Sequence, residues 1–196
     1  NIAIKFEVYL EDTNENEIRL AIRGLIPAFS WAMKEHLREF DYSEKENWIP
    51  QSIMEGFDKA KHKPNFILLE IGKHTIRLHK KGVITGEQLI VLETELNILI
   101  NVLGACERIR NTPMPVGYAI HLKRILLIYV ATLPLTFIDE LMWWTIPVVM
   151  LIFFTMVGIE LLGEEIEEPF GEDPNDLPFD AINKKIRDNV FEIMEE

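Results

Sequence analysis

The run LMWWTIPVVMLIFFTMVGI (residues 141–159) decides the class of this chain, because none of its 19 residues is charged. A helix of that length can cross the roughly 30 Å hydrocarbon core of a bilayer. The preceding run, ILLIYVATLPLTFI (125–138), is also uncharged. Residues 113–122 extend it backwards past Lys123 and Arg124, whose long side chains can reach an interface. The two runs together predict a pair of membrane-spanning helices.

The junction between the runs has the composition of a hairpin turn. Asp139 and Glu140 form a two-residue polar break, and Trp143 with Trp144 follows where aromatic residues mark a membrane interface. The alternative is a buried helical pair in a soluble domain. It is less favoured, because soluble core helices seldom run 19 residues without a charge or a polar stripe.

Charge is distributed unevenly along the 196 residues, whose formal net charge is −12. Residues 1–112 carry 15 basic and 17 acidic side chains, residues 113–159 carry two of each, and residues 160–196 carry 3 basic and 13 acidic ones. This acidity excludes a nucleic-acid-binding protein, which needs a basic surface. Cys106 is the single cysteine, so an internal disulfide and a multi-cysteine zinc site are excluded as well.

These patterns divide the chain into a cytosolic helical region at 1–112, a transmembrane hairpin at 113–162, and an acidic cytosolic loop with a C-terminal helix at 163–196. The chain opens with NIAIKFEVYLED, which is not a signal peptide. Basic residues precede the hairpin and none lies in its turn, so the positive-inside rule places both chain ends in the cytosol. These residues are Arg108, Arg110, Lys123 and Arg124.

The first region shows helical spacing and no persistent strand-like alternation, so the fold class is all-α. Apolar residues spaced by three, four or seven predict a helix over 16–40, in which Pro27 requires a kink or a break. A shorter helix is expected around 53–60. Four residues mark the ends of the next two helices. Pro64 begins the first helix and Gly82 ends it. Thr85 and Gln88 form a capping box at the start of the second helix.

The second of these helices carries the clearest apolar pattern in the chain. Steps of three and four form a packing seam made of Leu89, Leu92, Leu96, Leu99, Leu103 and Cys106. Ile98, Val102 and Ile109 add a second apolar flank. Such a helix needs cover on more than one side, from its own bundle or from a neighbouring subunit. Cover from its own bundle is the favoured alternative.

Catalytic motifs are absent from the sequence. It contains no GxGxxG, GxxxxGK[ST], HExxH or GxSxG pattern, and its five histidines do not pair at metal-ligand spacing. Glu70 and His74 lie one helical turn apart, but an exposed helix face explains them better than a metal does. Cys106 falls on the apolar seam, as a small hydrophobic residue does. We therefore predict neither an enzyme nor a cofactor.

The stretch ELLGEEIEEPFGEDPNDLPFD (160–180) holds most of the acidity. Helical spacing predicts that the second membrane helix continues into the cytosol with an acidic stripe, made of Glu160, Glu164, Glu167 and Glu168, before Pro169 ends it. A cation-attracting vestibule is one function of such a stripe. A second is a Ca²⁺ site in the loop, from Glu172, Asp173, Asn175 and Asp176, although glycine is missing at the sixth position of an EF-hand. A solvated acidic helix with an Asx-rich turn is the favoured alternative.

Three stretches together resemble the bestrophin family of ion channels: LGACERIRNTPMPVGYAIHLKR (103–124), LPLTF (133–137) and ELLGEEIEEPFGEDPNDLPFDAI (160–182). In that family a [GA]-C-E-R segment and T-P-x-P-x-x-Y precede a membrane helix, and G-x-x-x-E-[IL]-E-x-P-F-G-x-x-x-N-D-L-P follows the last one. FSWAMKEHLR (29–38) is similar to a further segment of the family. The NDLP ending is most like the bacterial branch, which implies a bacterial inner (plasma) membrane.

The resemblance implies passive permeation of monovalent ions, cations or chloride, through a homopentameric pore with four membrane helices per subunit. Two of those helices are expected before residue 1, so the chain corresponds to the cytosolic region and the last hairpin. A cytosolic aperture falls by spacing at Ile84 and Glu87, where a glutamate ring favours cations. The alternative function is a membrane-anchored helical interaction module without conduction.

The resemblance also bears on the acidic loop. In the eukaryotic branch the loop is a Ca²⁺ clasp completed by backbone from the N-terminal segment. Glu172, Asp173, Asn175 and Asp176 match it in part, but Pro174 interrupts the acidic run and the N-terminal partner is missing from this sequence. A structural role, in which the loop is pinned to a neighbouring subunit, is therefore at least as well supported as a Ca²⁺ site.

Overall fold

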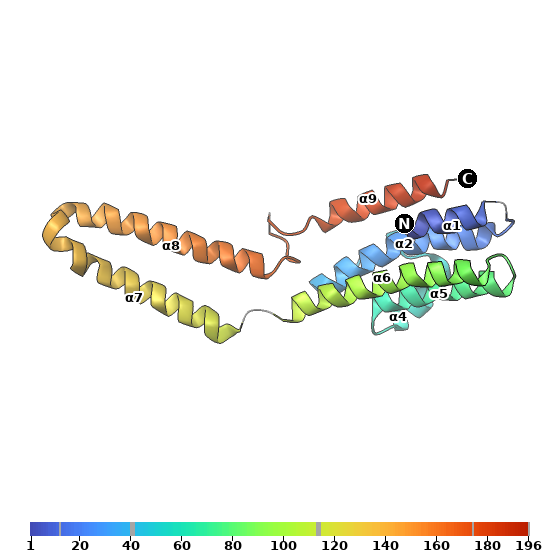
Figure 1. Cartoon of the computed structure of the whole chain (residues 1–196), viewed down its shortest axis with the longest axis horizontal. Helices are drawn as coiled ribbons and strands as arrows, with labels where there is room; N and C mark the ends of the chain where they lie inside the picture. The colour runs from blue at the N-terminus through green and yellow to red at the C-terminus, as the bar shows by residue number, and fades with distance from the viewer. Residues whose placement is uncertain (12, 40–41, 113–114, 174, 196) are drawn as a thin grey trace. The chain divides into compact units, whose positions relative to one another are not determined.

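The computed structural model describes residues 1–11, 13–39, 42–112, 115–173 and 175–195, and within these ranges the chain is helical without a strand (Figure 1). The predicted all-α class is confirmed. The helices are α1 (Ile2–Leu10), α2 (Asn16–Arg38), α3 (Lys45–Trp48), η1 (Gln51–Ile53), α4 (Met54–Lys59), α5 (Lys63–Lys80), α6 (Gly86–Asn111), α7 (Val116–Leu141), η2 (Met142–Trp144), α8 (Thr145–Glu167) and α9 (Phe179–Ile193).

The chain forms two compact units, and the first contains both ends of the sequence. It comprises Asn1–Arg108 and Pro178–Glu196, so α9 joins the helices of the first half although the hairpin separates them along the chain. Helix α2 lies at its centre and packs against α5, α9 and α1. The largest fully buried side chains include Phe6, Trp31, Phe57, Ile71 and Leu78.

Local signals in the first unit are reproduced, with one exception. Pro64 lies in the first turn of α5, and Gly82 adopts a φ of +73° just after the helix ends. Helix α2 continues through Pro27, so of the two expected outcomes the chain does not take the break, and a kink stays a prediction, since the missing amide of a proline removes one helical hydrogen bond there. Phe40, which the apolar spacing assigns to this helix, lies outside the described residues.

The predicted capping box at the start of α6 is present with both of its hydrogen bonds. The backbone N–H of Thr85 donates to Oε1 of Gln88 at 2.8 Å, and the backbone N–H of Gln88 donates to Oγ1 of Thr85 at 3.3 Å. The pair therefore satisfies two backbone amides that the helix itself leaves without an acceptor.

Helix α6 has one buried face and one exposed apolar flank. Leu92, Leu96 and Leu103 of the predicted seam are buried in the core of the first unit. The second flank is open, since Ile98, Val102 and Ile109 are 49%, 45% and 54% exposed. The expectation that the chain's own bundle covers this flank is wrong for the described residues.

The second unit, Ile109–Leu177, is built on the predicted hairpin of α7 and α8, joined by η2 (Figure 1). The turn lies later than expected, because α7 continues through Asp139 and Glu140 to Leu141. The chain reverses at Met142, whose φ is +48°, and Oγ1 of Thr145 donates to the carbonyl of Phe137 at 3.1 Å. Helix α8 extends to Glu167, as the acidic spacing predicts.

The hairpin is apolar and is not covered by the rest of the chain. Leu133 and Thr145 are its buried residues among those described, and in its most apolar stretch no residue is buried. By length and composition, Val116–Glu167 and Gly86–Asn111 are both apolar enough to cross a membrane. A buried soluble pair needs such cover, so the exposure fits a hairpin in lipid instead. Pro113 and Met114, at the start of the predicted hairpin region, lie outside the described residues.

Candidate functional site

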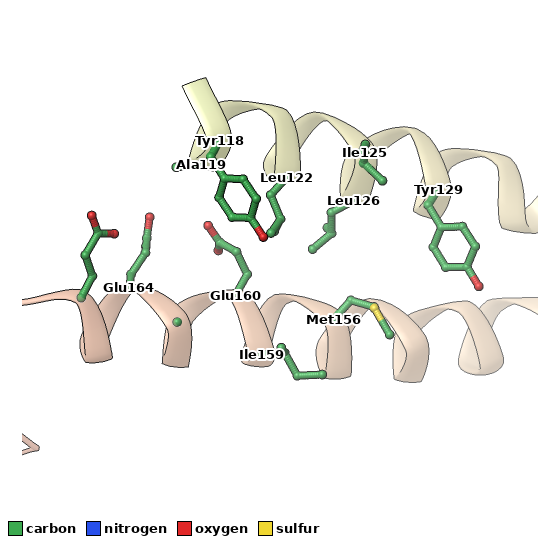
Figure 2. Close-up of a pocket in the computed structure, with 12 residues that line it drawn as sticks. Tyr118, Ala119, Leu122, Ile125, Leu126, Tyr129, Met156, Ile159, Glu160 and Glu164 are labelled. Atoms are coloured by element: carbon green, nitrogen blue, oxygen red, sulfur yellow. The ribbon is translucent and has the colours of Figure 1, made fainter. Parts of the chain in front are cut away.

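Three glutamates of the acidic stripe lie on the side of α8 that faces α7. Glu160, Glu164 and Glu167 line one end of a cavity of about 450 Å³ between α7 and α8, whose other walls are mostly apolar. Figure 2 shows Glu160 and Glu164 extending from α8 toward the helix that carries Tyr118. Nζ of Lys123 lies 3.2 Å from Oε1 of Glu160 and forms a second ion pair with Glu164. This end of the cavity therefore combines acidic groups with one lysine.

Glu168 lies elsewhere, with the loop that follows α8. Together with Glu165, Asp173 and Asp176 it lines a second hollow of about 300 Å³. The stripe that the spacing predicts is therefore divided between two surfaces. Glu160 and Glu167 line only the α7–α8 cavity, Glu168 lines only the hollow at the loop, and Glu164 lines both.

Hydrogen bonds within the second unit hold the acidic loop in shape. Nδ2 of Asn175 donates to Oε2 of Glu165 at 2.8 Å, and the backbone N–H of Asp173 donates to Oδ2 of Asp176 at 2.7 Å. Glu172 is exposed. Pro174 lies outside the described residues. Three of the four proposed Ca²⁺ ligands thus take part in these hydrogen bonds, Asn175 and Asp176 through their side chains and Asp173 through its backbone.

No three acidic ligand atoms of this loop converge closely enough to hold one ion, among the residues for which side chains are described. A Ca²⁺ ion takes six to eight oxygen ligands, so such a site needs further oxygens from elsewhere. The hydrogen bonds join the loop to itself and to α8, and this geometry favours a structural role for the loop.

The two aperture residues differ in what they present to solvent. Ile84 is 2% exposed in the core of the first unit, whereas Glu87 is exposed in the first turn of α6. A hydrogen bond from its own backbone amide and another from Thr85 lower the pKa of the Glu87 carboxyl, so it is ionised at neutral pH. Of this pair, only Glu87 offers a charged side chain to passing ions.

A cluster of histidines forms a further site that the local sequence does not predict. His36 at the end of α2 and His62 before α5 both approach Glu107 of α6. Nε2 of His36 lies 2.9 Å from Oε1 of Glu107, and Nε2 of His62 lies 2.8 Å from the same oxygen. The two imidazole ring centroids are 4.5 Å apart. Glu107 belongs to the C-E-R segment, but His36 is 71 positions from it and His62 is 45 positions from it. Only the packing of three helices brings them together.

The electrostatics of the cluster favour an ionised carboxylate. Partial burial acts to raise the pKa of Glu107, but hydrogen bonds from His62 and His36 outweigh it and hold that pKa below its ordinary value. The neighbouring Cys106 thiol has a raised pKa, because of burial and the charge of Glu107, so it is a poor nucleophile.

The alternative pair of metal ligands, Glu70 and His74, does not form a site in the described part of the chain. Oε1 of Glu70 lies 2.7 Å from Nζ of Lys73. Burial, with a further contribution from Arg77, lowers the pKa of His74. Neither residue belongs to a group of three converging ligand atoms.

Comparison with known proteins gives consistent matches. The model of a family described as "Bacterial/Fungal Bestrophin protein" matches residues 1–192. A voltage-dependent anion channel-forming protein of Nostoc sp. is 39% identical over 98% of this chain and 64% of its own length. A protein of the same name from Synechocystis sp. is 36% identical over 90% of this chain and 58% of its own length. The chain therefore spans less than two thirds of these relatives.

Solved structures of bestrophin homologues match the fold of this chain. A crystal structure of a mutated bacterial bestrophin homologue from Klebsiella pneumoniae superposes with a TM-score of 0.92 at 28% identity, over 100% of this chain and 72% of that one. The helical architecture, the acidic motif after α8 and the family model thus identify the same relationship. The chain belongs to the bestrophin family.

Proposed function

We propose that this chain is part of an ion-channel subunit that lets monovalent ions, cations or chloride, permeate passively through a homopentameric pore. The hairpin carries this proposal. Its two helices are uncharged over most of their length, and the chain leaves their side chains exposed. Exposed apolar helices of this length are stable in a lipid bilayer, where the backbone satisfies its own hydrogen bonds.

Two further observations support the proposal. The relatives from Nostoc and Synechocystis are named as channel-forming proteins. The exposed flank of α6 is an apolar surface on a helix whose opposite face is already buried, and a neighbouring copy of the chain is a natural cover for it.

Two observations point to different ion selectivities for the proposed pore. The names of the relatives specify anions. The exposed carboxylate of Glu87 and the acidic residues after the hairpin favour cations, since a ring of negative charge raises the local cation concentration. The charge at Glu87 is therefore the feature to change.

The proposed location is the inner (plasma) membrane of a bacterium, with both chain ends in the cytosol. Arg108, Arg110, Lys123 and Arg124 precede the membrane run, and no basic residue lies in the turn between α7 and α8.

The selectivity test uses the full-length protein in liposomes, with the reversal potential measured across a KCl gradient. Glu87→Lys changes the charge of each subunit by two, so we expect the reversal potential to move toward the equilibrium potential of chloride. Glu44→Lys makes the same change at an exposed position outside α6 and should leave the potential unaltered. An unchanged potential in Glu87→Lys contradicts the aperture assignment.

The mass of the full-length protein in detergent tests the assembly. A pentamer that conducts ions supports the channel. A monomer or dimer without ion flux supports the alternative, a membrane-anchored helical module that docks a partner through its cytosolic helices.

A further inference from the structure

Three metal-ligating side chains converge in the first unit from three different helical elements. His36 comes from the last turn of α2, His62 from the position that caps α5, and Glu107 from α6. Their ligand atoms all lie within 4.8 Å of one another. Both imidazoles direct Nε2 at the same carboxylate oxygen, at 2.9 and 2.8 Å. The cluster thus gathers two nitrogen ligands and one oxygen ligand around one point.

We propose that His36, His62 and Glu107 bind one divalent transition-metal ion of the Zn²⁺ type, with water completing the coordination. Two imidazole nitrogens and one carboxylate oxygen are a donor set that zinc commonly takes, with a fourth position left for water. Hard cations such as Ca²⁺ and Mg²⁺ prefer oxygen ligands alone, so this set disfavours them. The site is distinct from the acidic loop and from the aperture, and it does not depend on ion conduction.

Metal binding requires the ligand atoms of the cluster to adjust. Zinc bonds of 2.0–2.2 Å in a tetrahedral site place neighbouring ligand atoms about 3.3 Å apart. The carboxylate must therefore retreat by roughly half an ångström. The two imidazole nitrogens, which lie within 4.8 Å of each other, must reach the same separation. The side chains of His36, His62 and Glu107 are 26%, 36% and 29% exposed. This exposure gives the carboxylate room to move, admits an ion from solvent and leaves space for a water ligand.

Proton positions distinguish a metal site from a hydrogen-bonded cluster. An imidazole that binds a metal through Nε2 carries its remaining proton on Nδ1. Nδ1 of His62, however, accepts the backbone N–H of Asn65 at 3.3 Å as the cap of α5. Metal binding must therefore release the Asn65 amide to solvent, whereas the metal-free cluster retains the cap.

A bound ion has a structural consequence for the first unit. The ion links the end of α2 and the start of α5 to α6. In the metal-free state, His36 and His62 make this link through hydrogen bonds to one oxygen atom of Glu107. A ligand that binds only the folded state stabilises it, so the thermal midpoint of this unit rises with metal concentration.

The first experiment measures Zn²⁺ binding to the whole chain in detergent by calorimetry, after treatment with EDTA. We expect one ion per chain, with affinity reduced at least tenfold in His36→Gln and in Glu107→Gln. The second variant retains an oxygen that accepts from both histidines, so it separates metal binding from hydrogen bonding. His121→Gln removes an exposed histidine outside the cluster and should bind as the wild type does. Equal affinity in all of these proteins overturns the proposal.

The second experiment uses His62→Asn, because asparagine is a stronger helix cap than histidine and keeps α5 intact. We expect its thermal midpoint in EDTA to match or exceed that of the wild type, while Zn²⁺ raises the midpoint of the wild type alone. Zn²⁺ should also accelerate hydrogen exchange at the Asn65 amide of the wild type. A zinc-induced rise of the same size in His62→Asn, or an Asn65 amide that Zn²⁺ leaves unaffected, overturns the site.

Discussion

Lys123 shows how one charged residue is accommodated near an apolar hairpin. Its ammonium group lies between Glu160 and Glu164 of α8, at the end of the hairpin opposite the turn. An exposed ion pair of this kind contributes little in water, but it grows stronger where lipid lowers the local dielectric. The pairing therefore aligns the first turns of α7 with the last turns of α8.

Gly171 allows the acidic loop to close on itself. A Cβ atom at this position would lie 2.6 Å from Oδ2 of Asp176, the atom that accepts the backbone N–H of Asp173. Gly171→Ala should therefore displace Asp176 and break this hydrogen bond. We expect about fivefold faster hydrogen exchange at the Asp173 amide, which corresponds to the roughly 1 kcal/mol of a typical hydrogen bond.

The control for this substitution is Gly163→Ala in α8, where no atom lies within 4 Å of the added Cβ. It should leave exchange at Asp173 unchanged. If the two alanine variants exchange alike, the loop does not depend on Asp176 in the way that its geometry indicates.

At the scale of elements, the turn between α5 and α6 is specified by local chemistry. The left-handed φ of Gly82 ends one helix, and the side chains of Thr85 and Gln88 begin the next. These contacts fix where α6 starts, and therefore where Glu87 lies on its first turn. The proposed aperture is thus positioned by a capping box.

Removing the capping hydroxyl should weaken the first unit. We expect Thr85→Ala to lower its free energy of unfolding by about 1 kcal/mol, because an amide of the first turn loses its acceptor. The measurement is urea denaturation in detergent followed by circular dichroism. Thr85→Ser keeps the hydroxyl and should restore most of the loss, whereas a Thr85→Ala protein as stable as the wild type shows that the box is dispensable.

For the whole molecule, the exposed flank of α6 is the surface most directly tied to assembly. Val102 is 45% exposed and does not belong to the core of the first unit, so a charge there leaves the folded chain intact. If a neighbouring copy covers this flank, a buried unpaired carboxylate disrupts the contact. We expect Val102→Asp in the full-length protein to reduce the mass measured in detergent from that of the oligomer to that of smaller species.

Asn97→Asp is the matched control, since it places the same carboxylate at an exposed polar position on the same helix. It should keep the mass of the wild type. If Val102→Asp keeps the mass of the oligomer, a neighbouring copy does not cover this flank of α6, which then faces another environment such as lipid. The flank would no longer support the proposed homopentamer.

Much of the fold follows from short-range patterns. The uncharged run 141–159 determines the hairpin, Pro64 and Gly82 bound α5, and the acidic spacing extends α8 beyond the apolar run. These features depend on residues a few positions apart, where helical periodicity and capping act. The chain reverses at Met142, after the predicted break at Asp139 and Glu140, because charge alone does not end a helix and the reversal depends on the backbone at Met142.

The sequence by itself therefore determined the all-α class, the apolar hairpin and the acidic motif that marks the family. Only the tertiary structure decided which surfaces stay open and which distant residues meet. It exposed the second flank of α6, divided the acidic stripe between two surfaces and brought His36 and His62 to Glu107. Periodicity assigns a residue to a face of its own helix, but the partner of that face is set by packing between segments that are far apart in the chain.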